Sequence, residues 1–152
     1  LIMKLFIFLT CLFLSNYSVA EGLTSSLVDN IKSGDFTLSD IQVLRELDVS
    51  KEKIGYGMCV DSGGRPDGLS NVCALSGSVG YGLCVSAGGR PDGLSNVCAT
   101  NGSIGYGLCV IGGGKPDGLS NVCSKSGSIG YGLCVIGGGK PDGLSNVCSS
   151  KK

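Results

Sequence analysis

The stretch IGYGLCVIGGGKPDGLSNVCS occupies residues 104–124 and returns unchanged at residues 129–149. Two earlier copies, which begin at Ile54 and Val79, differ from it at a few positions. The chain from residue 54 onward is therefore four repeats of 25 residues, the last one residue shorter: 54–78, 79–103, 104–128 and 129–152. A fixed period of this length is typical of repeat proteins, so the fold of one repeat decides the fold of most of the chain.

The first half of each repeat alternates large residues with glycine and cysteine, as at Tyr56, Met58 and Val60. This period of two predicts a short strand. The segment Gly-Arg-Pro-Asp-Gly at residues 64–68 suits a tight turn, because proline presets the backbone and glycine accepts positive φ. Residues 69–73 then return as a second strand. We therefore expect a small disulfide-rich repeat protein of four short β-hairpin-like units.

The repeats carry eight cysteines, two in each, with fourteen residues from the first to the second. The chain has no histidine and no Cys-x-x-Cys pair, so the spacing does not match that of zinc sites. An even number of cysteines behind a secretory leader favours disulfides. The midpoint of each pair falls in the predicted turn, which favours pairing within a repeat, although other connectivities stay open. The predicted disulfide cysteines are Cys59, Cys73, Cys84, Cys98, Cys109, Cys123, Cys134 and Cys148.

One repeat alone has few large apolar side chains, among them Tyr56, Leu69 and Val72, and six glycines. Burying so few side chains does not offset the entropy lost on ordering the segment, even with a disulfide. Either the repeats stack on one another, or they remain stapled and partly flexible loops. The sequence favours the second of these.

The residues before the repeats divide into two parts. Residues 1–20 have the pattern of a signal peptide: Met3 as the start, Lys4, a largely apolar run of ten residues from Leu5 to Leu14, and small residues before Glu21. An apolar run of ten residues is too short to span a bilayer. Residues 21–53 hold seven acidic and four basic residues and no cysteine. A capping pattern at residues 37–40 predicts a helix to about Asp48, after a weaker helix at 25–32. We interpret 21–53 as an acidic helical spacer or propeptide; a docking helix is the alternative.

Composition argues against several function classes. Without histidine the commonest general base is absent, and the cysteines are better explained as disulfides than as nucleophiles, so we expect no enzyme. The repeats hold too few clustered bases to bind nucleic acid. One turn aspartate in each 25-residue repeat supplies too few oxygen ligands for calcium. We therefore expect no cofactor and no metal site. Asn101 lies in an Asn-Gly-Ser acceptor sequence for N-glycosylation.

The segment SAGGRPDGLSN, residues 86–96, resembles the core of plant CLE signalling peptides, with Gly89, Pro91, Asp92 and Asn96 matching in order. It departs from that core in an inserted Arg90, in Gly93 for the second proline and in Ser95 for histidine. The whole layout, a leader, an acidic segment and Gly/Cys-rich repeats, resembles the secreted avirulence proteins of root-knot nematodes. The resemblance implies a protein delivered into a plant host, acting on or recognised by extracellular receptors there.

We therefore predict a secreted, extracellular, non-enzymatic effector that presents four GG(R/K)PDGLSN loops to a host protein, in the manner of a peptide ligand. Two other functions stay open: a structural repeat of an extracellular coat or matrix, and a precursor of several small disulfide peptides. The predicted partner-binding residues are Gly64, Arg65, Pro66, Asp67, Asn71, Gly89, Arg90, Pro91, Asp92, Asn96, Gly114, Lys115, Pro116, Asp117, Asn121, Gly139, Lys140, Pro141, Asp142 and Asn146.

Overall fold

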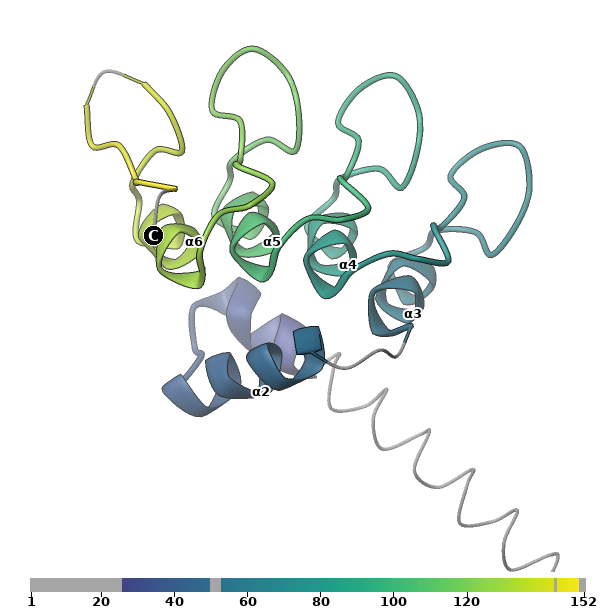
Figure 1. The fold of residues 1–152 in the computed structure, drawn as a ribbon, viewed down its shortest axis with the longest axis horizontal. Helices are drawn as coiled ribbons and strands as arrows, with labels where there is room; N and C mark the ends of the chain where they lie inside the picture. Colours follow the sequence, from purple (N-terminus) through teal and green to yellow (C-terminus); the bar gives the residue numbers. More distant parts are fainter. Residues whose placement is uncertain (1–25, 50–52, 144, 151–152) are drawn as a thin grey trace, which may run out of the picture.

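The computed structural model describes residues 26–49, 53–143 and 145–150. Within these ranges the regular structure is helical. The helices are residues 26–33, α2 (Leu38–Val49), α3 (Ile54–Asp61), α4 (Val79–Ser86), α5 (Ile104–Ile111) and α6 (Ile129–Ile136). Figure 1 shows α3 to α6 side by side in a curved row, with one irregular loop rising from each. The helix at residues 26–33 and α2 lie along the opposite side of the row, away from the loops.

A serine directly before each of the last three repeat helices explains where these helices begin. Ser78, Ser103 and Ser128 have extended backbones, and each hydroxyl accepts a hydrogen bond from the tyrosine N–H three residues on, at 3.1–3.2 Å. This is the geometry of an N-cap. The first repeat has Lys53 at this position and no side-chain cap.

Glycine explains where these helices end. In the second repeat Gly88 has φ of +97°, which disfavours other residues. Gly88 N–H donates to the Val85 carbonyl at 2.9 Å, and Gly89 N–H donates to the Cys84 carbonyl at 3.0 Å. This pair of bonds is a Schellman motif, which closes a helix and sends the chain off in a new direction. The same pattern recurs in the other repeats.

The prediction of β-hairpins is wrong. No strand occurs at residues 53–143 or 145–150, where the β-structure is limited to isolated bridges such as Arg65 to Val72. The alternation of glycine with larger residues at 55–60 belongs to a helix. Residues two apart point about 200° apart around a helix, so glycines at this spacing open two opposite helix faces. A helix with glycines two residues apart therefore shows the same alternation of small and large residues in its sequence as a strand.

Those two glycine faces explain why the repeats stack. A Cβ added to Gly80 would lie 2.0 Å from the carbonyl oxygen of Ser103, the N-cap residue of the next repeat helix, α5. A Cβ added to Gly82 would lie 2.8 Å from the Met58 Cβ of the preceding repeat. Neighbouring helices thus approach until backbone touches side chain, and Tyr81 between these glycines is fully buried. The expectation of partly flexible, separate loops is wrong, because the apolar area that one repeat lacks is supplied by its neighbours.

Two apolar clusters hold the row together. One follows the disulfides and the tyrosines along the loop side of the helices. The other joins the repeat helices to the N-terminal helices, through residues such as Leu83, Leu108, Ile31 and Leu44. The segment before the repeats is therefore packed into the core of the fold.

The helix predicted from residue 37 is confirmed as α2. The Asp40 carboxylate accepts bonds from the Thr37 N–H, at 2.7 Å, and from the Thr37 hydroxyl, at 2.8 Å. The backbone hydrogen bond from Thr37, with a smaller contribution from its hydroxyl, lowers the pKa of Asp40. The weaker helix predicted at 25–32 is present at 26–33. The predicted signal peptide at 1–20 lies outside the described residues. Among the helices described, none is long and apolar enough to cross a membrane.

Candidate interaction surface on the repeat loops

Each loop is closed by a disulfide within its own repeat, as the cysteine spacing predicts. The bonds are Cys59–Cys73, Cys84–Cys98, Cys109–Cys123 and Cys134–Cys148, with Cα atoms 5.8–5.9 Å apart. Each bond joins the repeat helix to the end of its loop. In the second repeat Gly89 lies against this bond, and a Cβ there would be 2.3 Å from the Cys98 Sγ. The second glycine of the Gly-Gly pair is thus required by the disulfide beneath it.

Backbone bonds close the loop a second time, above the disulfide. Arg90 N–H donates to the Asn96 carbonyl at 2.7 Å, and Cys98 N–H donates to the Arg90 carbonyl at 2.8 Å. Asn96 has φ of +60°, a left-handed conformation that asparagine tolerates better than most residues. Its side-chain amide donates to the Gly88 carbonyl at 3.2 Å. Arg90, Asn96 and Cys98 thus form the closed base of the loop, here called the loop neck. The five residues between Arg90 and Asn96 project from it.

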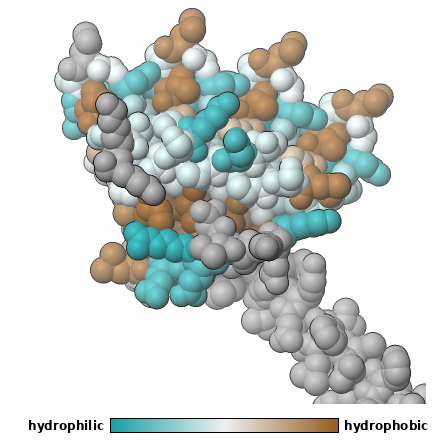
Figure 2. All heavy atoms as spheres, in the orientation of Figure 1, coloured by the Kyte–Doolittle hydropathy of each residue, from teal (hydrophilic) through white to brown (hydrophobic). Residues whose placement is uncertain are grey.

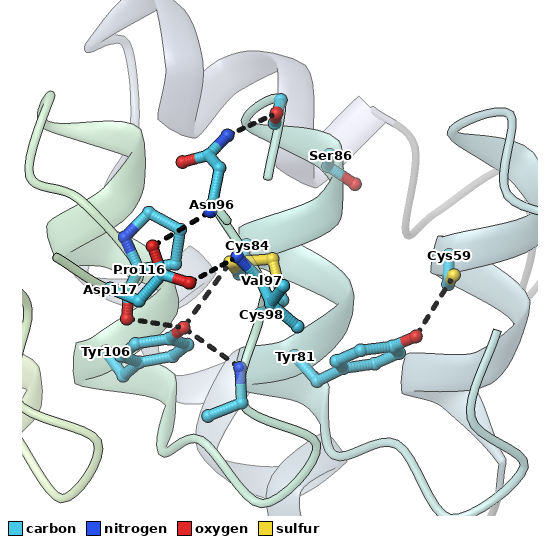
Figure 3. The surroundings of a disulfide bond; sticks show 12 residues. Cys59, Tyr81, Cys84, Ser86, Asn96, Val97, Cys98, Tyr106, Pro116 and Asp117 are labelled. Atoms are coloured by element: carbon cyan, nitrogen blue, oxygen red, sulfur yellow. Dashed lines mark hydrogen bonds between the residues drawn. A yellow bond between two sulfur atoms is a disulfide. The ribbon is translucent and has the colours of Figure 1, made fainter. Parts of the chain in front are cut away.

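The aspartate of the Pro-Asp-Gly turn joins adjacent loops. The two Asp117 carboxylate oxygens accept from Asn96 N–H and Val97 N–H of the preceding loop, both at 2.8 Å (Figure 3). Asp92 holds the first loop in the same way, at 2.7 and 2.9 Å, and Asp142 accepts from Asn121 N–H. This carboxylate is therefore a structural group in three of the four repeats.

The repeat tyrosines also reach back to the preceding repeat. Tyr106 points toward the Cys84–Cys98 disulfide in Figure 3, and its hydroxyl accepts from Ala99 N–H at 3.0 Å. Burial raises the pKa of Tyr106, the hydrogen bond from Ala99 opposes this increase, and the nearby Asp117 carboxylate adds to it. Tyr81 accepts in the same way from Ala74 N–H and Tyr131 from Ser124 N–H, and the pKa of both is raised, mainly by burial.

The most exposed apolar side chains of the described residues stand at the loop tips. Leu69, Leu94 and Leu119, here called the tip leucines, are as accessible as in an extended chain, at 104%. Figure 2 shows apolar groups at the outer ends of the loops, separated by polar surface. The charged side chains exposed at the loop necks are Arg65, Arg90, Lys115 and Lys140.

The predicted partner-binding residues have several different environments. Arg65, Arg90, Lys115, Lys140 and the four asparagines Asn71, Asn96, Asn121 and Asn146 are exposed. Gly89, Gly114, Pro91 and Pro116 are buried, whereas Gly64, Gly139 and Pro141 are half-buried and Pro66 is exposed. Asp92, Asp117 and Asp142 are half-buried between loops, and Asp67 is exposed. The loops therefore bring the basic residues, the asparagines and the tip leucines to one surface.

The tip leucines are missing from the predicted site. The predicted hairpin places Leu69 in a strand, where it would be a core residue. The residue that indicates its exposure is Gly68 directly before it, whose φ of +128° turns the chain outward.

Two other features lie outside the loops. A shallow groove beside residues 26–33 carries the charged groups Asp29, Lys32 and Asp61. Asn101, the predicted glycosylation residue, is exposed in a turn between repeats. Across the described ranges, no three His, Cys, Asp or Glu side chains cluster closely enough to hold a metal ion. The loops of the four repeats, here called the loop row, bring more candidate binding residues together than either of these two features.

Comparisons of the chain with protein-family models, with curated proteins and with solved structures give no significant match.

Proposed function

We propose that the chain is a secreted, non-enzymatic binding protein that presents its row of disulfide-stapled loops to an extracellular protein partner. The observation that carries the proposal is the complete exposure of the tip leucines Leu69, Leu94 and Leu119 on loops whose backbones are fixed. Leaving large apolar side chains in water is unfavourable, and repeating the exposure in successive loops marks an interaction surface.

The rigidity of the loops supports binding. A disulfide, two backbone bonds and an asparagine amide bond hold the neck of the second loop. The aspartate of the following repeat fixes it from the side. A loop ordered before binding loses little conformational entropy when a partner engages it. The leucine is thus displayed in one conformation.

Charge indicates what kind of partner fits. Arg65, Arg90, Lys115 and Lys140 are exposed at the loop necks. Asp92, Asp117 and Asp142 are occupied by backbone N–H groups of neighbouring loops. Apart from Asp67, the exposed charged groups of the loops are therefore basic. A partner with apolar pockets bordered by acidic residues complements this surface, and several linked loops raise its avidity if the partner has several such pockets.

The resemblance to nematode avirulence proteins suggests where such a partner occurs, namely among receptors on plant cells. In this reading the loops act as effector ligands in the host. The alternative of a structural coat cross-linked through tyrosine is less favoured, because Tyr81, Tyr106 and Tyr131 are buried between repeats.

The test is binding of the oxidised chain, produced in a secretory pathway, to a panel of extracellular receptor domains from plant roots. Replacing the three tip leucines with serine is expected to abolish binding, with at least a tenfold loss of affinity, since each removed side chain contributes about 1–2 kcal/mol. Because these side chains make no packing contact, the variant keeps the thermal stability of the parent.

The matched control is Leu38→Ser, which removes an equally large exposed leucine, 87% accessible, from the start of α2. It is expected to leave binding unchanged. Binding that survives loss of the tip leucines, or absence of binding to every receptor domain in the panel, contradicts the proposed function.

A further inference from the structure

We propose that the chain associates head to tail with further copies of itself, the first repeat of one copy packing on the fourth repeat of the preceding copy. The two ends of the row are the same surfaces that the inner repeats bury against one another. The first and the fourth repeat keep, on their outer faces, the residues that make the contacts between the inner repeats.

The outer face of the fourth repeat corresponds to the face of the third repeat that receives the fourth. A Cβ at Gly105 would lie 2.0 Å from the Ser128 carbonyl oxygen, whereas at Gly130 its nearest neighbour is the Ser128 hydroxyl at 3.9 Å. Cys109 is fully buried and Cys134, the equivalent cysteine, is exposed. Since residues 104–124 and 129–149 are identical, the difference comes from the packing of the fourth repeat on the third.

The outer face of the first repeat lacks the contacts that the later repeats make with the repeat before them. A Cβ at Gly57 would meet nothing within 4 Å, whereas one at Gly132 would lie 2.5 Å from the Leu108 Cβ. Pro66 and Asp67 are exposed, although the equivalent proline and aspartate of the second repeat are buried and half-buried. Tyr56 is half-buried, in contrast to the fully buried tyrosines of the second and third repeats.

The contacts between inner repeats specify those between copies. The Asp67 carboxylate would accept from Asn146 N–H and Val147 N–H of the preceding copy, as Asp117 accepts from Asn96 and Val97. Val147 is the exposed apolar residue at that end, at 50%. The Tyr56 hydroxyl would accept from Ser149 N–H, as Tyr131 accepts from Ser124 N–H.

Formal charge favours the same arrangement. The first repeat has Asp61, Arg65 and Asp67, a net −1, and the fourth has Lys140, Asp142, Lys151 and Lys152, a net +2. The helix at residues 26–33 and α2 lie along the side of the row opposite the loops rather than across its ends (Figure 1). Since the contact joins two different faces, it does not close on itself and extends into an open chain of copies.

The experiment blocks one end at a time. Gly57→Leu adds a side chain where the single chain has open space but where Leu133 of the preceding copy would pack. Gly130→Leu does the same at the other end. Sedimentation velocity of the full, oxidised chain is expected to show a mass that rises with concentration for the parent, and a monomer for each variant.

Mixing the two variants gives the decisive result. Each retains the end that the other has lost, so the mixture is expected to form a dimer, about twofold the monomer mass, and to grow no further. Circular dichroism checks that each variant keeps the helical content of the parent. A parent that stays monomeric at every concentration, a variant that still associates, or a mixture that stays monomeric overturns the proposal. None of these results affects binding of a receptor to the loops of a monomer, so the two proposals fail separately.

Discussion

The third and fourth repeats have the same residues at 104–124 and 129–149 and yet occupy different environments. Ile104, Leu108 and Cys109 are buried, whereas Ile129 and Leu133 are half-buried and Cys134 is exposed. The difference teaches that a repeat does not enclose its own core. Burial, carboxylate pairing and the close approach of glycines are properties of the junction between repeats, so equivalent substitutions should have unequal effects along the row.

The largest expected difference is between Gly105→Ala and Gly130→Ala. The alanine Cβ at 105 would overlap the Ser128 carbonyl oxygen, 2.0 Å away, and neither backbone can move without separating the helices. We expect a loss of roughly 3 kcal/mol in the free energy of unfolding. Gly130→Ala meets only a hydroxyl at 3.9 Å and should gain up to about 1 kcal/mol from helix propensity.

Urea unfolding of both variants in dilute solution, followed by circular dichroism, measures this difference. Equal losses in the two variants would mean that the helices, rather than the junctions, determine the stability of the row.

A smaller difference is expected between Tyr106→Phe and Tyr56→Phe. The Tyr106 hydroxyl accepts from Ala99 N–H at 3.0 Å, and removing it leaves that half-buried amide without this partner. The expected loss is about 2 kcal/mol, whereas Tyr56, with no repeat before it, should lose less than about 0.5 kcal/mol. Hydrogen exchange at Ala99 gives a second measurement, because its amide should exchange faster in Tyr106→Phe only.

The next difference concerns the aspartates. Asp92→Asn keeps the shape of the side chain but replaces one of the oxygens that accept from Asn71 N–H and Val72 N–H with an amide. We expect a loss of about 1 kcal/mol, and no change for Asp67→Asn, whose carboxylate is exposed. Thermal unfolding of the two variants checks this. An equal decrease in melting temperature would show that charge, rather than the bonds between loops, is responsible.

The sequence predicts the parts of the fold that depend on local chemistry. Fourteen-residue spacing around a proline turn predicts each disulfide, as between Cys84 and Cys98. The threonine and aspartate of the capping pattern predict α2. Both predictions need only residues that are near one another in the chain, which is why they are correct.

The repeat helices are not predicted, because their cause is not local. Two glycines among eight residues disfavour a helix, at about 1 kcal/mol each relative to alanine. In α4 this is offset by the packing that Gly80 and Gly82 allow with the neighbouring repeats. The serine N-cap before each of α4, α5 and α6 is the local signal that indicates a helix. The exposure of the tip leucines is not predicted for the same reason. A strand would place Leu69 in the core, whereas the projecting loop exposes it to solvent.

The smallest effect is expected at alkaline pH. Burial, aided by Asp92, Asp117 and Asp142, raises the pKa of Tyr81, Tyr106 and Tyr131 above 10, so the folded chain holds these protons more tightly than the unfolded one. Stability is then constant below pH about 10 and falls as pH rises through the folded-state values. Short pH jumps, with urea midpoints and tyrosinate absorbance recorded together, measure this. The decrease should be shallower in Tyr106→Phe, which has one fewer buried phenol. An equally steep decrease in Tyr106→Phe would mean that the alkaline loss does not come from the tyrosines buried at the junctions.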